Sequence, residues 1–112
     1  MTVPRLSRRL YLERAERVAD GAGGFDITWV VVASVWGEIT ARTGRERRLL
    51  EAPVSSMSYR IVVRGAPQGS PLRPRPDQRF REGSRIFNIR AVTERGFDGR
   101  FLTCFADEEV AV

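Results

Sequence analysis

The apolar residues between positions 27 and 39 recur at every second residue, which is the pattern of a β-strand. One face would carry Trp29, Val31, Ala33 and Val35, and the other Thr28, Val30, Val32, Ser34 and Trp36. β-Branched and aromatic side chains dominate this segment, and they favour a long strand that is apolar on much of both faces. Residues 57–64 alternate in the same way and predict a second strand.

Shorter alternating runs predict three further strands in the second half of the chain. They cover residues 78–81, 85–92 and 100–105, and the glycine-containing segments 82–84 and 96–99 predict the turns between them. The chain is therefore rich in short strands joined by tight connections.

The segment 6–19 admits two interpretations. Tyr11 and Ala15 follow helical spacing, whereas Leu10 and Leu12 alternate with their neighbours as in a short strand that ends near Ala15. The glycine-rich run that follows, at residues 20–24, predicts a flexible turn in either case.

Residues 45–52 are rich in Arg, Glu and Leu and predict a short helix, which Pro53 would end. Together the patterns predict a mainly β protein with five or six short strands and one short helix, hence a small β-barrel or sandwich. A chain of 112 residues has the size of one domain, and we expect residues 1–112 to form it.

A long proline-rich loop is predicted at residues 65–77, which contain four of the six prolines. Proline fixes φ and cannot donate to a strand ladder, so we expect a stiff, extended segment with hinges at Gly65 and Gly69. Arg73 and Arg75 lie in this loop, and guanidinium groups bind phosphate well. The alternative is a solvent-facing surface loop without a ligand.

The residue types that the chain lacks exclude several kinds of chemistry. It contains no histidine, no lysine and a single cysteine, Cys104, which we expect to be a small buried apolar side chain. Histidine-based catalysis, Schiff-base chemistry, disulfides and thiolate zinc sites are therefore excluded. We expect a binding or structural protein rather than an enzyme, with no metal and no cofactor. No apolar run predicts a membrane span or a signal peptide, so synthesis in the cytoplasm is expected.

The net charge of +5 is unevenly distributed along the chain. Residues 60–100 hold ten arginines and four carboxylates, a balance of +6, which favours a polyanionic partner. An ordinary solvated surface built from arginine is an equally weighted alternative. The adjacent carboxylates at 107–109 predict a solvated acidic end.

Trp29 and Trp36 are seven residues apart, so a regular strand would place them on opposite faces. They could stack nucleic-acid bases, but packing in the core and at an interface is the favoured interpretation. The phenylalanines are interpreted in the same way, as core residues first.

An ordered series of motifs resembles the head–tail connector proteins of tailed phages, which are also called head–tail joining, adaptor or stopper proteins. The series spans about residues 8–109 and consists of Leu-Tyr-Leu-Glu-Arg at 10–14, Asp20 with Gly23-Gly24, Thr28-Trp29, Val35-Trp36 with Glu38-Ile39, Thr43-Gly44-Arg45-Glu46, Tyr59-Arg60-Ile61-Val62-Val63-Arg64, the run from Gly83 to Val92, and Arg100-Phe101-Leu102. The resemblance implies a small β-barrel with a short helix, and it favours a strand at residues 10–15. The arginine-only basic set points to a prophage or a gene transfer agent.

The resemblance also implies a function. Such proteins form rings between the portal or adaptor protein and the tail protein, and double-stranded DNA passes through the channel. We expect a ring of six or twelve copies, with the stopper as the favoured layer, in a virion that assembles in the host cytoplasm. Trp29 and Trp36 would lie at the subunit interface. The loop at 65–77 corresponds by position to the loop that closes the channel, and Arg73, Arg75 and Arg79 would face DNA without reading bases.

The leading alternative from another class is a free-standing nucleic-acid-binding barrel of the OB or SH3 type. An enzyme ranks below both.

Overall fold

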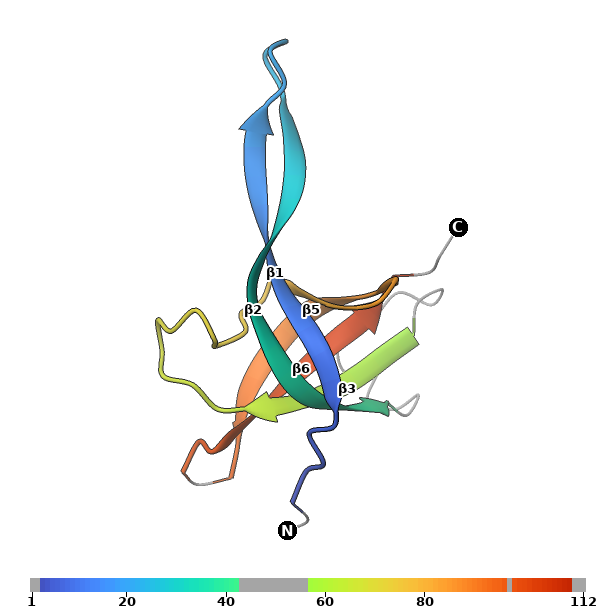
Figure 1. Cartoon of the computed structure of the whole chain (residues 1–112), viewed down its shortest axis with the longest axis vertical. Coiled ribbons are helices and arrows are strands. Elements are labelled where there is room, and N and C mark those ends of the chain that lie inside the picture. Colours follow the sequence, from blue (N-terminus) through green and yellow to red (C-terminus); the bar gives the residue numbers. More distant parts are fainter. Residues whose placement is uncertain (1–2, 43–56, 97, 110–112) are drawn as a thin grey trace.

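The computed structural model describes residues 3–42, 57–96 and 98–109 as a closed antiparallel barrel with a long projecting hairpin (Figure 1). The order of neighbouring strands around the barrel is β1-β2-β3-β6-β5-β4. The strands are β1 (Arg8–Ala19), β2 (Phe25–Ala41), β3 (Met57–Arg64), β4 (Arg79–Glu82), β5 (Arg85–Arg95) and β6 (Phe101–Glu108). The predicted mainly β barrel is confirmed. The predicted helix at 45–52 lies outside the described residues, which contain no helix.

The N-terminal segment is a strand and not a helix, as the family resemblance favoured. β1 continues to Ala19, well beyond the expected end near Ala15, because it pairs with β2 over its whole length. Leu10 and Leu12 are fully buried and point into the barrel, so their alternation in the sequence reflects the inner face of a strand.

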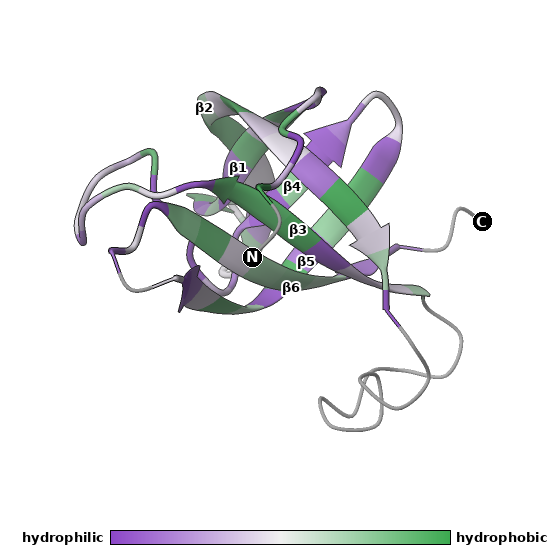
Figure 2. Cartoon of the chain, turned by 90° about the horizontal axis from the view of Figure 1, so that it is seen from below, coloured by the Kyte–Doolittle hydropathy of each residue, from purple (hydrophilic) through white to green (hydrophobic). Residues whose placement is uncertain are grey.

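The barrel encloses one core, to which five of the six strands contribute buried apolar side chains. Figure 2 shows hydrophobic residues along the strands that surround it. These are Leu10 and Leu12 from β1, Ile61 and Val63 from β3, Phe80 from β4, Phe87 and Ile89 from β5, and Leu102, Cys104 and Ala106 from β6. Strand β2 adds the partly buried Val35 and Ile39. Phe80 and Phe87 are thus core residues as predicted, whereas Phe97 lies outside the described residues.

Two β-bulges change which side chains face the core. In β2, Leu12 pairs with Ala33 and Glu13 pairs with Val31, so Val32 is the extra residue. In β5, Arg90 is skipped between Ile89 and Ala91. Beyond a bulge, the positions in the strand that would have faced inward face outward, and the reverse. Each bulge therefore changes which residues in the rest of its strand face the core.

The barrel closes at a short seam between β1 and β4, where Tyr11 pairs with Arg81, Leu12 with Phe80 and Glu13 with Arg79. The Glu13 carboxylate is buried and accepts hydrogen bonds from Arg79 Nε at 2.8 Å and Arg81 Nε at 2.9 Å. Burial alone would raise the pKa of Glu13, but the hydrogen bonds from the two guanidinium groups outweigh it and hold that pKa below its ordinary value. The seam is therefore joined by one buried anion between two cations.

Ion pairs also order the acidic end of the chain, so the prediction of solvated carboxylates is wrong for Asp107 and Glu108, whereas Glu109 is exposed. Asp107 is buried in β6, where it accepts hydrogen bonds from Ser58 Oγ and Arg90 Nε, both at 2.9 Å. Glu108 accepts from Arg85, whose hydrogen bond lowers the pKa of Glu108. Pairing of β6 with both β3 and β5 carries these carboxylates into the sheet.

Gly65 begins the proline-rich loop at a point of close backbone contact rather than at a free hinge. Its N–H donates to the carbonyl oxygen of Arg100 at 2.7 Å. A Cβ at this position would overlap the carbonyl oxygen of Gly99 and lie 3.1 Å from the carbonyl carbon of Arg100. Only glycine fits there without a backbone shift.

We predict that Gly65→Ala lowers the free energy of unfolding by about 3 kcal/mol, because the added methyl group meets backbone that cannot rotate away. Gly69→Ala is the control: Gly69 has a φ of +85° but open space around it, so the cost should be about 1 kcal/mol. Urea denaturation of both variants measures the difference. Equal decreases in the unfolding free energy of the two variants would show that the backbone contact at Gly65 does not determine the cost of the substitution.

A second prediction concerns pH. The lowered pKa values of Glu13, Glu82 and Glu108 mean that the folded chain binds fewer protons than the unfolded one near their ordinary pKa of 4.5. The stability that they add is fully present above about pH 4.5 and is lost as the pH falls below it. Glu13→Gln should lower the unfolding free energy at pH 7 by about 2 kcal/mol, and its deficit should shrink towards pH 3.

The matched control is Glu16→Gln, which removes a carboxylate with an exposed partner, Arg14. Its effect should stay below about 0.5 kcal/mol at every pH. Thermal unfolding between pH 3 and pH 7 tests both variants. A loss of unfolding free energy in Glu13→Gln that does not change with pH would contradict the lowered pKa of Glu13.

Candidate functional site

The first candidate surface is the arm, which we define as residues 14–19 and 25–31 with the turn between them. The arm projects beyond the barrel (Figure 1). β1 pairs with β4 only over Tyr11–Glu13, and β2 pairs with β3 only over Gly37–Ala41, so the arm strands pair only with each other among the described residues. The Asp20 carboxylate closes the tip by accepting hydrogen bonds from the N–H groups of Ala22 and Gly24.

One face of the arm is apolar. The register places Phe25, Ile27, Trp29 and Val31 on it, opposite Ala19, Arg17, Ala15 and Glu13 respectively. Phe25 is 56% exposed and Ile27 61% exposed, and the guanidinium carbon of Arg17 lies 4.2 Å from the centre of the Phe25 ring. The other face carries Arg14, Glu16, Val18, Asp26, Thr28 and Val30. The arm is therefore an amphipathic two-stranded ribbon whose apolar face is exposed at Phe25 and Ile27, while Arg79 lies over Trp29 at its base.

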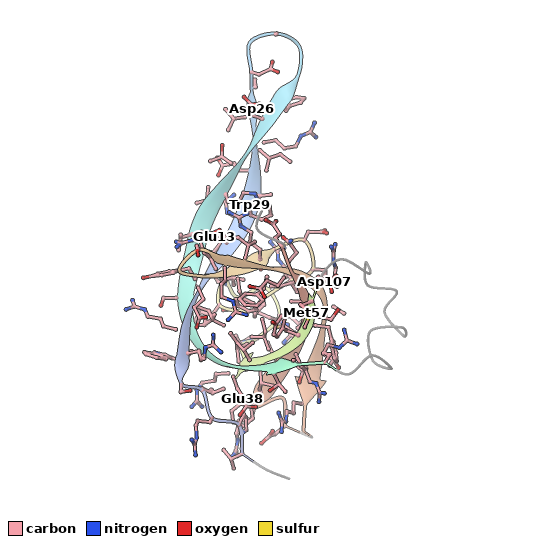
Figure 3. The ribbon with its side chains drawn as sticks, turned by 90° about the vertical axis from the view of Figure 1, so that its right-hand side faces the viewer. Glu13, Asp26, Trp29, Glu38, Met57 and Asp107 are labelled. Carbon is pink, nitrogen blue, oxygen red and sulfur yellow. The ribbon has the colours of Figure 1, made fainter. Side chains whose placement is uncertain are left out.

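The two tryptophans lie on the same face of the hairpin, contrary to the prediction. Trp36 pairs with Arg9 and Trp29 with Ala15; these partners are six residues apart in β1 and share a face. The bulge at Val32 is the reason, because it reverses the alternation between the two tryptophans. Figure 3 shows Trp29 at the base of the arm, between Glu13 at the barrel and Asp26 towards the tip. Trp36, in the barrel, is 55% exposed.

A second apolar surface, the Trp36 groove, is a hollow of about 380 Å³ beside the start of the proline-rich loop. Its apolar lining comes from Leu6, Val35, Trp36, Ala66 and Leu72. Arg64 is the charged residue among the described residues that line it, and Leu72 is 53% exposed. The groove brings together three segments that are far apart in the sequence.

The loop at 65–77 is folded back on itself and is not an extended polyproline segment, so that prediction is wrong. Its backbone forms turns, with Ser70 N–H donating to the Pro67 carbonyl and Arg73 N–H to the Ser70 carbonyl, both at 3.0 Å. Pro74 is buried. The prolines occupy turn positions here, where their fixed φ suits a compact loop as well as an extended one.

The loop and the arm together form a basic pocket of about 280 Å³. Arg73 and Arg75 line it from the loop and Arg14 from the base of the arm, and no acidic residue is among the described residues of its lining. Arg73 is only 14% exposed in its side chain and donates from Nη1 to the Ala66 carbonyl at 2.9 Å, whereas Arg75 is exposed. We call this the arginine pocket.

Arg79 lies outside the arginine pocket. Its side chain is 16% exposed, its Nε binds Glu13, and its guanidinium carbon lies 4.1 Å from the centre of the Trp29 ring. These contacts link the barrel seam to the base of the arm. The structure therefore brings Arg73 and Arg75 together and separates Arg79 from them.

The described residues hold little reactive chemistry. Cys104 is fully buried, as predicted, and burial raises the pKa of its thiol to about 12. Within residues 3–42, 57–96 and 98–109, no three Cys, Asp or Glu side chains gather in a way that could hold a metal ion. The same part of the chain contains no helix that is long and apolar enough to cross a membrane.

Sequence reasoning missed the arm and the Trp36 groove as separate surfaces. The available signal was the pair of apolar runs on either side of the turn at 20–24, which is the sequence signature of a hairpin. This signature could not show that the hairpin extends beyond the barrel, because the extension depends on the length of β4.

Comparisons with known proteins agree with this architecture. A chain from the virion of a native gene transfer agent particle is 53% identical, with a TM-score of 0.77 over 97% of this chain and all of that one. A Shigella flexneri 2a protein solved in solution has a TM-score of 0.70 over 96% of each chain at 18% identity, which shows the shared fold alone. No curated protein matches.

The family model described as "phage head completion protein" matches residues 1–109, which is nearly the whole chain. The resemblance to phage proteins that the motifs indicated is thereby confirmed: this chain belongs to the phage head completion protein family.

Proposed function

We propose that this protein is a structural component of the head–tail interface of a phage-like or gene transfer agent particle, in the stopper layer of that interface. The observation that carries the proposal is the family match over residues 1–109, together with the 53% identical chain of a native gene transfer agent virion. The protein would reside in the virion and assemble in the host cytoplasm.

The proposed assembly is a homo-oligomeric ring of six or twelve copies between a portal or adaptor protein and a tail protein. Two features support it. The apolar face of the arm and the Trp36 groove expose apolar side chains that the barrel core does not use, and such surfaces mark protein–protein contacts. A two-stranded ribbon is also marginally stable in water unless it packs on something. Trp36 would lie in the subunit interface, and Trp29 at its margin under Arg79.

The proposed role of the ring is passage and retention of double-stranded DNA. The arginine pocket supports it, because three guanidinium groups line it and guanidinium groups bind phosphate well, while the nearby carboxylates of Glu94 (3.9 Å from Arg73) and Glu16 (3.3 Å from Arg14) lie outside its described lining. Contacts to phosphates carry no sequence information, so the ring would hold DNA of any sequence. Arg75 would make the main contact, with Arg14 beside it and Arg73 fixing the loop. The contacts of Arg79 fit a role in joining the arm to the barrel.

The ring is tested with Trp36→Ala. Because Trp36 is 55% exposed, the unfolding free energy of the monomer should change by less than about 1 kcal/mol, while the amount of ring in purified particles should fall. Negative-stain micrographs and quantification of the protein in particles measure this. If the wild-type protein occurs in particles as a monomer, the ring is wrong.

The DNA contact is tested in particles that carry Arg14→Ser with Arg75→Ser. They should assemble and fill, yet lose DNA during purification or storage, because two phosphate contacts per subunit are missing. Arg5→Ser with Arg100→Ser is the matched control, since it removes two exposed arginines that line neither the arginine pocket nor the Trp36 groove. Equal DNA retention in both double variants and the wild type would contradict the role of the pocket.

A further inference from the structure

The arm and the Trp36 groove are two different uncovered apolar surfaces on one chain, and they lie at opposite ends of the long hairpin. Phe25 and Trp36 are eleven positions apart in β2, which is roughly 35 Å of strand. The arm is paired along its whole length up to Ala19 and Phe25 and cannot bend back over that distance. A chain therefore cannot fill its own groove with its own arm.

We infer that the arm of one copy docks in the Trp36 groove of the next copy, with Phe25 and Ile27 as the inserted side chains. This inference rests on the proposed ring and specifies its subunit contact. A contact between two different patches is heterologous, and repeated around an axis it closes a ring. An isologous contact between two arms would stop at a dimer and leave every groove empty.

Apolar complementarity is the first argument for a second copy as the occupant. Phe25 and Ile27 are the two most exposed large apolar side chains of the arm, and they are neighbours on one face. The groove presents Trp36 and Leu72, each more than half exposed, and its volume of about 380 Å³ admits a phenyl ring with an aliphatic neighbour. Burying these four side chains together removes large apolar surfaces of both patches from water.

Charge complementarity is the second argument. The outer part of the arm, residues 17–28, contains Asp20 and Asp26 against one basic residue, Arg17, a balance of −1. The groove contains Arg64, and the described residues of its lining include no acidic side chain. Both Asp26 and Arg64 are exposed. An acidic tip that approaches an arginine-bearing groove is attracted, whereas two tips or two grooves repel each other, which again favours the heterologous arrangement.

Site-directed crosslinking in purified particles tests the contact. In the variant Phe25→Cys with Leu72→Cys, oxidation should link neighbouring copies into a ladder of covalent oligomers beyond the dimer on a non-reducing gel. Cys104 stays in place, because its buried thiol does not react in the folded protein. The matched control is Thr28→Cys with Leu72→Cys, which places the thiol on the opposite face of the arm and should give at least tenfold less of the ladder.

A pair of arm variants supplies a second readout. Phe25→Ser with Ile27→Ser removes the inserted side chains and should lower the amount of ring, whereas Asp26→Ser with Thr28→Ala, on the opposite face of the arm, should leave it near the wild-type amount. Absence of the ladder, together with an undiminished ring in the Phe25→Ser with Ile27→Ser variant, would overturn the arm contact and leave the proposed function intact. Dimers without higher oligomers would also overturn it. Particles without any ring of this protein would overturn the proposed function itself.

Discussion

Closure of the barrel depends on the contact between β1 and β4, in which three residue pairs join the two ends of an otherwise open sheet. Leu12 and Phe80 fill the inner side of this seam, and Glu13 with Arg79 and Arg81 holds the outer side. Two guanidinium groups on one buried carboxylate leave the anion satisfied, whereas loss of the carboxylate would leave two cations facing each other. The seam is thus the shortest pairing in the barrel, and it contains a buried ion pair.

The same seam determines the shape of the molecule. Because β4 has only four residues, it can pair with only a small part of the twelve residues of β1, and the part of β1 beyond Glu13 leaves the barrel together with β2. The bulge at Val32 lies next to this point, at the register shift between Leu12 and Glu13. There the hairpin changes from a barrel wall into a free ribbon, and its apolar face continues the outer face of the barrel rather than its core.

Stability and the proposed assembly contacts therefore fall mainly on different parts of one small chain. The buried side chains and the ion pairs at the seam and at the acidic end hold the barrel together, while the exposed side chains of the arm, the Trp36 groove and the arginine pocket lie outside the core; Val35 both lines the groove and packs on the core. Arg79 connects the two parts, since it binds Glu13 in the seam and covers Trp29 at the base of the arm. A change at the seam would consequently affect the direction of the arm as well as the stability of the barrel.

The sequence by itself determined the fold class and most of the strands. The strand predicted at residues 57–64 has the same bounds as β3, and burial of Cys104 followed from its position in an apolar strand. Periodicity carries this information because each residue reports its own face of a regular strand. Tertiary structure alone decided where that regularity breaks. Three features depend on partners far away in the chain, and a local sequence pattern therefore cannot predict them. They are the bulges at Val32 and Arg90, the length of the seam, and the pairing of Asp107 with Arg90.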